Sequence, residues 1–391
     1  MTRTAGSKSL WIALYLALAA STGAALAACG GSSEIAPQAM PQSVSPAHAM
    51  AQWQRMRAAQ PACPDARPGE AQCLALIQSR SGIGPTVAGW TPSVIQTRYK
   101  LPSTTKGTGQ IVAIVDAFDN PNVASDLAAY RSEFGLGTAN FSKYNQLGQQ
   151  KNYPKGNSGW GVEIDLDVEM VSASCPLCTI YLIEANGAYG SDLEAAEAEA
   201  VTLGAHIVTN SWICYGSVSC VGQSFFDTPG VEYLAAAGDS GQGQEGAPMA
   251  FATVASIGGT QITQCGSSYC ENPWSGSGGG CVTSIKKPRW QHDTVCAGRA
   301  TNDAAAVSWD LAVYDSYGYS GWFTVGGTSA ASPLLAGVFG LAGNATEQVG
   351  GRTFWLRKHR RHLYDLCDGS CLFSSYSYGT GWGSPDGIRA F

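Results

Sequence analysis

The chain has 391 residues, which is enough to bury a large core in one or two domains. Only 13% of the residues are charged, whereas glycine alone accounts for 48 of them. This composition excludes an intrinsically disordered chain, and a net charge of -6 argues against a partner recognised through its phosphate backbone. We therefore expect a tightly turned globular α/β or β-rich protein that binds no nucleic acid.

The first 28 residues are typical of a secretory signal peptide, since Arg3 and Lys8 precede an apolar run from Leu10 to about Ala28. The run ends in Leu-Ala-Ala-Cys-Gly, which resembles the lipobox of bacterial lipoproteins, where cleavage leaves the cysteine, here Cys29, as the lipidated first residue. Ordinary cleavage after an Ala-x-Ala site is the alternative. The sequence thus predicts an exported bacterial protein, either held at the membrane by a lipid on Cys29 or secreted.

Cysteine usage supports export. There are thirteen cysteines, and removing Cys29 leaves an even number, which in an exported chain indicates a disulfide framework whose connectivity the sequence alone does not fix. The twelve fall into close pairs: Cys63/Cys73, Cys175/Cys178, Cys214/Cys220, Cys265/Cys270, Cys281/Cys296 and Cys367/Cys371. The CxxC spacing at Cys175 lacks the context of a redox or zinc site, so a structural disulfide is favoured there.

After the signal peptide, we interpret residues 29–88 as a Pro- and Ala-rich tether that ends in a short segment bounded by cysteines. From residue 89 onward, strands and helices alternate. The sequence predicts a short helix through Tyr99, strands at 111–116, 179–183, 207–210, 233–237 and 254–257, and helices at 123–133, 163–173 and 192–203. Beyond Thr260 we expect mostly loops. Continuous rather than alternating apolarity at 111–115 indicates a strand covered on both faces, and hence a doubly wound, mainly parallel sheet flanked by helices in a single domain, 89–391.

One stretch near the end of this domain could hold a nucleophile. Two glycines, Gly326 and Gly327, lead through Thr328 into Ser329 and then into an apolar helical run. A serine at that place sits beside the free backbone N–H groups of a helix N-terminus, where negative charge is stabilised. A helix cap before a buried helix is the commoner explanation for such a motif.

Histidine, the usual base for a serine nucleophile, has no suitable position here. The five histidines lie in the tether, at a strand entry, in a cysteine-bounded loop and in a basic patch: His48, His206, His292, His359 and His362. Two carboxylate motifs could replace the base. Glu163 and Asp167 are four residues apart, which places them on one face of a helix, and Asp239 lies in a Gly-Asp-x-Gly turn after a strand. Taken alone, a solvated acidic helix is the better explanation for Glu163 and Asp167, and an Asx-turn is a fair explanation for Asp239.

Taken together and in this order, the three motifs resemble the sedolisin family, the serine-carboxyl peptidases, over about residues 89–391. The resemblance implies a subtilisin-like fold and a protein or peptide substrate. It also implies that Ser329 attacks the peptide carbonyl, that Glu163 acts as general base, and that Asp167 hydrogen-bonds Glu163 and orients it. Asp239 would donate a hydrogen bond to the oxyanion and must therefore be protonated, and Asp116, after the first strand, would support the acidic cluster.

An unperturbed aspartate titrates at about 3.9, so this role of Asp239 predicts activity below about pH 5 unless burial raises the value. The chain departs from the family in two ways. It has too few residues before the domain for a long folded propeptide, and the family's calcium site is matched by Asp365 and Leu366 but has Ser377 in place of a later aspartate. We expect this calcium site to be degenerate, and no other cofactor is indicated. The alternative to a peptidase is a catalytically silent surface protein that uses the same fold for binding.

Overall fold

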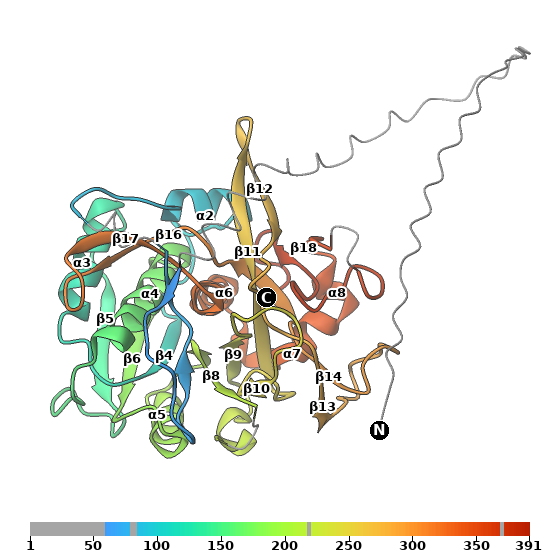
Figure 1. Cartoon of the computed structure of the whole chain (residues 1–391). Helices are drawn as coiled ribbons and strands as arrows, with labels where there is room; N and C mark the ends of the chain where they lie inside the picture. The colour runs from blue at the N-terminus through green and yellow to red at the C-terminus, as the bar shows by residue number, and fades with distance from the viewer. Residues whose placement is uncertain (1–58, 79–83, 217–219, 368–370) are drawn as a thin grey trace, which may run out of the picture. The chain divides into compact units, whose positions relative to one another are not determined.

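The computed structural model describes residues 59–78, 84–216, 220–367 and 371–391 (Figure 1). The predicted signal peptide and Cys29 lie outside these residues. Within the described part of the chain, no helix is both long enough and apolar enough to cross a membrane.

A mainly parallel sheet forms the centre of the domain, as predicted. Its parallel strands run in the order β5 (Asn140–Asn145), β6 (Thr179–Ala185), β4 (Ile111–Ala117), β7 (Ile207–Asn210), β9 (Glu232–Ala236) and β11 (Val254–Cys265). Strand β15 (Ala304–Val307) pairs in parallel with β11, and β12 (Ser268–Pro273) turns back on it as an antiparallel hairpin that projects from the sheet in Figure 1. The order of crossovers is that of an open, doubly wound α/β sheet.

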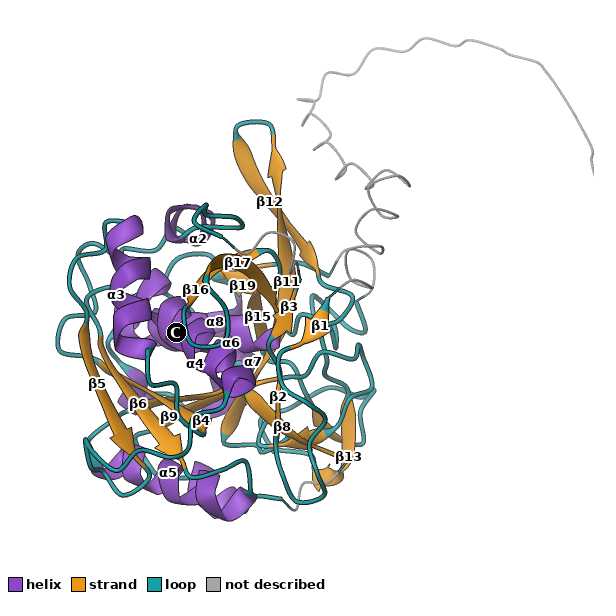
Figure 2. Ribbon diagram, turned by 60° about the vertical axis from the view of Figure 1, so that its left-hand side comes forward, coloured by secondary structure: helices purple, strands orange, loops and turns teal. Residues whose placement is uncertain are grey.

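Helices cover both faces of this sheet, which explains the continuous apolar strands. Along β4, Val112 and Ile114 join one buried cluster with helices α4 (Ser158–Ser174) and α6 (Thr328–Ala342), whereas Ala113 and Val115 join another with helix α5 (Gly190–Thr202). In Figure 2, α5 lies on one side of the strands and helix α3 (Val123–Glu133) on the other. Burial on both faces leaves no polar alternation along β4, as the sequence indicated.

Most predicted elements agree with the structure, including α3, β7 and the short helix α2 (Pro92–Tyr99). Helix α4 begins at Ser158, earlier than predicted, because the side chain of Asn157 accepts hydrogen bonds from the free amides of Gly159 and Trp160.

The prediction of loops beyond Thr260 was wrong. That region continues β11 and then forms β12, β13 (Cys281–Lys286), β14 (Gly298–Ala300), β15, β16 (Leu311–Asp315) and β17 (Gly321–Gly326). Several of these strands are short and lie at the edges of sheets. The glycine-rich segments that connect them therefore determined the sequence pattern, which is typical of loops.

Residues 59–78, from the predicted tether, form strands that pair with the domain. Strand β2 (Gln72–Cys73) pairs antiparallel with β8 (Trp212–Tyr215), and β3 (Leu76–Ile77) pairs antiparallel with β17 and with β1 (Gln60–Pro61). The six close cysteine pairs are all joined as disulfides, in the pairing that their spacing suggested.

Candidate active site

Ser329 lies at the start of α6, directly after the tight passage from β17 into the helix. Gly327 forms this turn with a φ of 118°, a conformation that favours glycine. A Cβ on Gly327 would also lie only 2.2 Å from the carbonyl oxygen of Leu74 and 2.9 Å from Oδ2 of Asp239. The sequence motif Gly-Thr-Ser therefore brings a serine, a carboxyl group and a neighbouring backbone carbonyl into close proximity.

The Ser329 side chain is fully buried, and its hydroxyl donates to the carbonyl of Ser211 at 3.4 Å. Ser211 follows β7 and places its own hydroxyl 2.8 Å from Oδ1 of Asp167 and 3.1 Å from the carbonyl oxygen of Ser329. Ser211 was not among the predicted site residues. Its place directly after β7, at the carboxyl end of a central parallel strand, is the signal that could have identified it.

Glu163 and Asp167 face the same site from successive turns of α4, and Asp116 faces it from β4. All three side chains are completely buried. Burial is the largest cause that raises the pKa of each carboxyl group, and the neighbouring charge of Asp116 raises the pKa of Glu163 and Asp167 further. The cluster as a whole therefore keeps protons to a higher pH than exposed carboxylates do.

Within this cluster, Asp116 is favoured over Glu163 as the protonated carboxyl group. Neither oxygen of Asp116 has a hydrogen-bond partner among the residues that the structure describes, so an ionised Asp116 would be an uncompensated buried charge. Glu163, in contrast, accepts hydrogen bonds at Oε2 from the backbone N–H groups of Leu74 and Ala75, both at 2.7 Å. These bonds and the Ser329 hydroxyl lower the pKa of Glu163 and partly offset its burial. The geometry thus favours a negative charge on Glu163 while Asp116 stays neutral.

Asp167 had been expected to hydrogen-bond Glu163. The hydrogen bond that the structure gives Asp167 comes from Ser211 Oγ instead, which lowers its pKa, while the charge of Glu163 raises it. Asp167 is therefore linked to the nucleophile's backbone through Ser211 as well as to Glu163 through its charge.

Asp239 approaches Ser329 from the loop after β9. Its Oδ1 accepts hydrogen bonds from the backbone N–H and the hydroxyl of Thr328, both at 2.8 Å. Its Oδ2 is buried and has no partner within the described part of the chain. Burial raises the pKa of Asp239 to about 7, against the lowering effect of Thr328. Below this pH the carboxyl group carries a proton. Because Oδ1 already accepts two hydrogen bonds, this proton is on Oδ2.

In the described part of the chain, no hydrogen bond joins a histidine to a residue of this site, in agreement with the sequence analysis. Nδ1 of His206 is 2.9 Å from the carbonyl of Gly230, and Nδ1 of His359 is 3.0 Å from that of Ala390. Within the described residues, the Ser329 hydroxyl interacts with the Ser211 carbonyl and with Glu163, and neither partner is a histidine.

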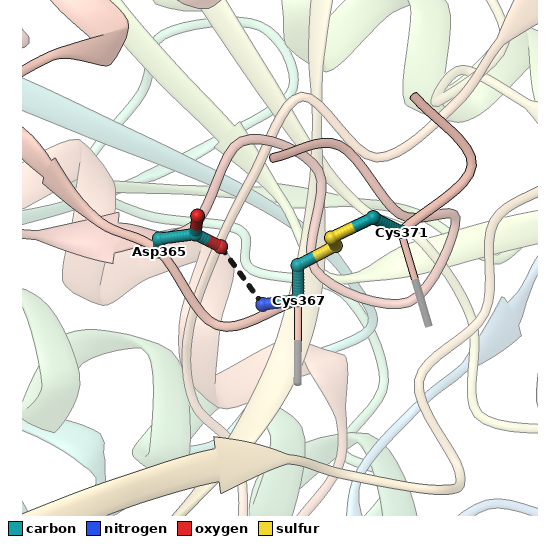
Figure 3. A group of neighbouring side chains, drawn as sticks. All are labelled: Asp365, Cys367 and Cys371. Carbon is teal, nitrogen blue, oxygen red and sulfur yellow. Dashed lines mark hydrogen bonds between the residues drawn. A yellow bond between two sulfur atoms is a disulfide. The ribbon is translucent and has the colours of Figure 1, made fainter. Parts of the chain in front are cut away.

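The residues present do not fit a calcium ion at the predicted position (Figure 3). Oδ1 of Asp365 accepts a hydrogen bond from the backbone of Cys367 at 3.0 Å, and the sulfurs of Cys367 and Cys371 are joined in a disulfide, so neither is a thiolate. Ser377 bonds Thr380 through its hydroxyl at 2.8 Å. Calcium requires about six oxygen ligands, several of them carboxylates. The described residues around Asp365 supply one carboxylate, and we assign no chemical step to a metal.

Comparison with known proteins finds one sequence relative and several solved structures with a similar fold. No protein-family model matches the chain. Sedolisin from Pseudomonas sp. (strain 101) is 22% identical over 351 residues, which cover 77% of this chain and 60% of that protein, so the chain spans less than two thirds of this relative's length. The solved structure of Pseudomonas sedolisin, a serine-carboxyl proteinase complexed with two molecules of pseudo-iodotyrostatin, superposes with a TM-score of 0.66 at 21% identity and covers 77% of this chain and 96% of that one.

A structure described as the S41 psychrophilic protease is more distant, with a TM-score of 0.54 at 18% identity over 78% of this chain and 99% of that one. The sequence match and the superposition show that the chain has a subtilisin-like fold and that it is similar to a sedolisin.

Proposed function

We propose that this protein is a serine-carboxyl endopeptidase that hydrolyses peptide bonds through an acyl-enzyme on Ser329. One observation carries the proposal: a buried serine at a helix N-terminus has a carboxylate cluster on one side and, on the other, a carboxyl group with one oxygen that no described residue hydrogen-bonds. A structural helix cap would need neither of these groups. A base, a nucleophile and an oxyanion donor are the three parts that acyl transfer requires.

In the first half of the reaction, Ser329 Oγ attacks the peptide carbonyl and transfers its proton to Glu163. The carbonyl oxygen becomes an oxyanion, which accepts a hydrogen bond from the protonated Oδ2 of Asp239. Glu163 then gives the proton to the leaving amine, the C–N bond breaks and an ester on Ser329 remains. In the second half, Glu163 takes a proton from water as the water oxygen attacks the ester carbonyl. The bond between this carbon and Ser329 Oγ then breaks, the product leaves as a carboxylic acid, and Glu163 returns the proton to Ser329 Oγ.

The two carboxyl groups set opposite pH requirements. Glu163 must be ionised to accept a proton, and Asp239 must be protonated to donate one. Because burial raises the pKa of Asp239 to about 7, the alkaline limit of activity moves from the value near 5 that an exposed aspartate implies to about 7. The raised pKa of Glu163 moves the acidic limit upward as well. We therefore place the optimum in the acidic range, with a decline as the pH passes about 7.

We also place the protein outside the cytoplasm, acting on protein or peptide substrates. Six disulfides fit an oxidising compartment, in keeping with the signal peptide that the sequence predicts. Lipidation of Cys29 remains a prediction, and mass spectrometry of the N-terminal peptide from membrane fractions would test it.

The function is tested by hydrolysis of casein and of peptides from strongly acidic to mildly alkaline pH. We expect cleavage that depends on both Ser329 and Glu163, so that Ser329→Ala and Glu163→Ala abolish it. If no Ser329-dependent cleavage occurred anywhere in that range, the binding-protein alternative would be favoured.

A further inference from the structure

Three side chains that the proposed peptidase reaction does not use meet at the carboxyl ends of neighbouring strands. Lys143 lies on the edge strand β5, Glu184 lies near the end of β6, and Asp119 follows the end of β4. The three strands are neighbours in the order β5, β6, β4, so the strand that carries Glu184 lies between the other two (Figure 1). An amine and two carboxyl groups are thus collected from three separate parts of the chain.

The amine of Lys143 is in direct contact with the carboxyl group of Asp119. Its Nζ donates to Oδ1 of Asp119 at 2.5 Å and to the carbonyl oxygen of Asn120 at 3.0 Å. The ring of Tyr153 covers the amine, with its centroid 4.2 Å from Nζ. The side chains of Lys143 and Asp119 are each 13% exposed. An amine and a carboxyl group that are held together and largely away from water are the two reactants of an amide bond, already in place.

Glu184 lies beside this pair and is completely buried. Its Oε1 lies 3.5 Å from Nζ of Lys143 and accepts a hydrogen bond from the backbone N–H of Asn120 at 3.2 Å. No described donor reaches Oε2, whereas the carboxyl group of Asp119 lies within hydrogen-bonding reach of Glu184. Burial raises the pKa of Glu184 to about 9, although the charge of Lys143 lowers it. At neutral pH Glu184 therefore carries a proton next to Asp119.

An ordinary ion pair does not explain this third group. Asp119 already balances the charge of Lys143, and a completely buried carboxyl group beside the pair adds a desolvation cost without a second cation to offset it. A protonated carboxyl group in contact with both reactants is instead what a proton transfer between them requires.

We propose that Lys143 and Asp119 react with each other to form an amide bond between their side chains, with Glu184 as the proton carrier. The proton between Nζ and Oδ1 moves to the carboxyl group of Asp119, which leaves a neutral, nucleophilic amine. Nζ attacks Cγ of Asp119 and the C–N bond forms. Glu184 gives its proton to the departing hydroxyl group, the C–O bond breaks, and Glu184 takes a proton from the nitrogen. The products are one amide and one water molecule, and Glu184 is protonated again.

This bond joins the edge strand of the sheet to the loop that follows β4. The next residue in that loop, Asn120, donates through its side chain to Asp165 and to the carbonyl of Gly161, both on α4. The crosslink therefore fixes the connection between the edge of the sheet and the helix that carries Glu163. It does not depend on the proposed peptidase activity, and either proposal can fail without the other.

The test is mass spectrometry of the full chain after reduction and alkylation of its cysteines. We expect the protein to be lighter than its processed sequence by the mass of one water molecule. After digestion with trypsin, we expect residues 107–131, which contain Asp119, to be joined to residues 132–151, because trypsin does not cleave after an acylated Lys143. Full mass, together with cleavage after Lys143, would overturn the proposal without the need for any variant.

Two variants test the assigned roles. Lys143→Arg keeps the positive charge but removes the amine, so we expect full mass, and a water loss that persisted there would place the reaction elsewhere and refute the crosslink. Glu184→Gln keeps the shape and both reactants but cannot carry the proton, so we expect the bond to form about 10² times more slowly or less. A complete crosslink in freshly purified Glu184→Gln would overturn the role of Glu184.

A second lysine–aspartate pair in the same chain provides a matched control. Nζ of Lys100 lies 2.7 Å from Oδ1 of Asp386, but the two side chains are 62% and 38% exposed. Water solvates this pair, so we expect its tryptic peptides to be recovered separately from the same digest. Joined peptides at both pairs would mean that contact alone produces the bond, and would refute the assignment to the buried group of three.

Discussion

Asp239→Asn is the most direct test of the proposed oxyanion donor. In the structure Oδ1 of Asp239 accepts two hydrogen bonds from Thr328, and Oδ2 is free to donate only when it carries a proton. An asparagine keeps the shape, its carbonyl can accept the same two bonds, and its amide can donate from the position of Oδ2 at any pH. The substitution should therefore preserve much of the acidic activity and remove the decline above neutral pH.

The size of the effect follows from the pKa of about 7 for Asp239. Each pH unit above this value lowers the protonated fraction, and with it kcat/KM of the unsubstituted protein, about tenfold. The decline should end about 10² to 10³ below the optimum, because a single oxyanion donor contributes roughly that factor. In the acidic range we expect Asp239→Asn to stay within about tenfold of the parent, since the amide is a weaker donor than a carboxylic acid.

The assay is kcat/KM for a fluorogenic peptide, measured across the pH range in the parent and in Asp239→Asn. Asp126→Asn is the control, because Asp126 is also a carboxyl group with a raised pKa but accepts its hydrogen bonds from Ser316 in a separate cluster. An unchanged alkaline limb in Asp239→Asn, or an alkaline optimum in the parent, would refute the assignment of Asp239.

Three further predictions concern the base, the metal and the stability. Glu163→Gln keeps the shape but cannot accept the proton, so we expect kcat to fall by about 10² to 10⁴ without loss of folding, and a smaller loss would point to another base. A chelator should leave the melting temperature unchanged, since the described residues at Asp365 do not fit calcium. The melting temperature should be highest in acid. Buried carboxyls such as Asp239 have folded pKa values above their unfolded ones, so the stability that they contribute is complete below about pH 4 and lost as the pH rises through the folded pKa, about 7 for Asp239. For that group alone, the shift from 3.8 amounts to roughly 4 kcal/mol, and calorimetry that showed stability rising from pH 4 to 8 would contradict the argument.

The sequence predicted the parts of the site that a local motif carries. Glu163 and Asp167 share a helix face because their spacing matches the helical repeat, and Ser329 lies at a helix start because Gly327 permits the turn. Continuous apolar runs likewise predicted the parallel sheet. These features depend on neighbours within a few residues, so a single stretch of sequence contains the information.

What the sequence did not predict depends on partners far apart in the chain. Ser211 lies near Asp167 only because β7 ends beside α4, and Leu74 reaches Glu163 across 89 positions. The strands after Thr260 were missed for a related reason, because short edge strands are defined by their pairing rather than by their own composition. The raised pKa of Asp239 also follows from burial, which no local motif encodes.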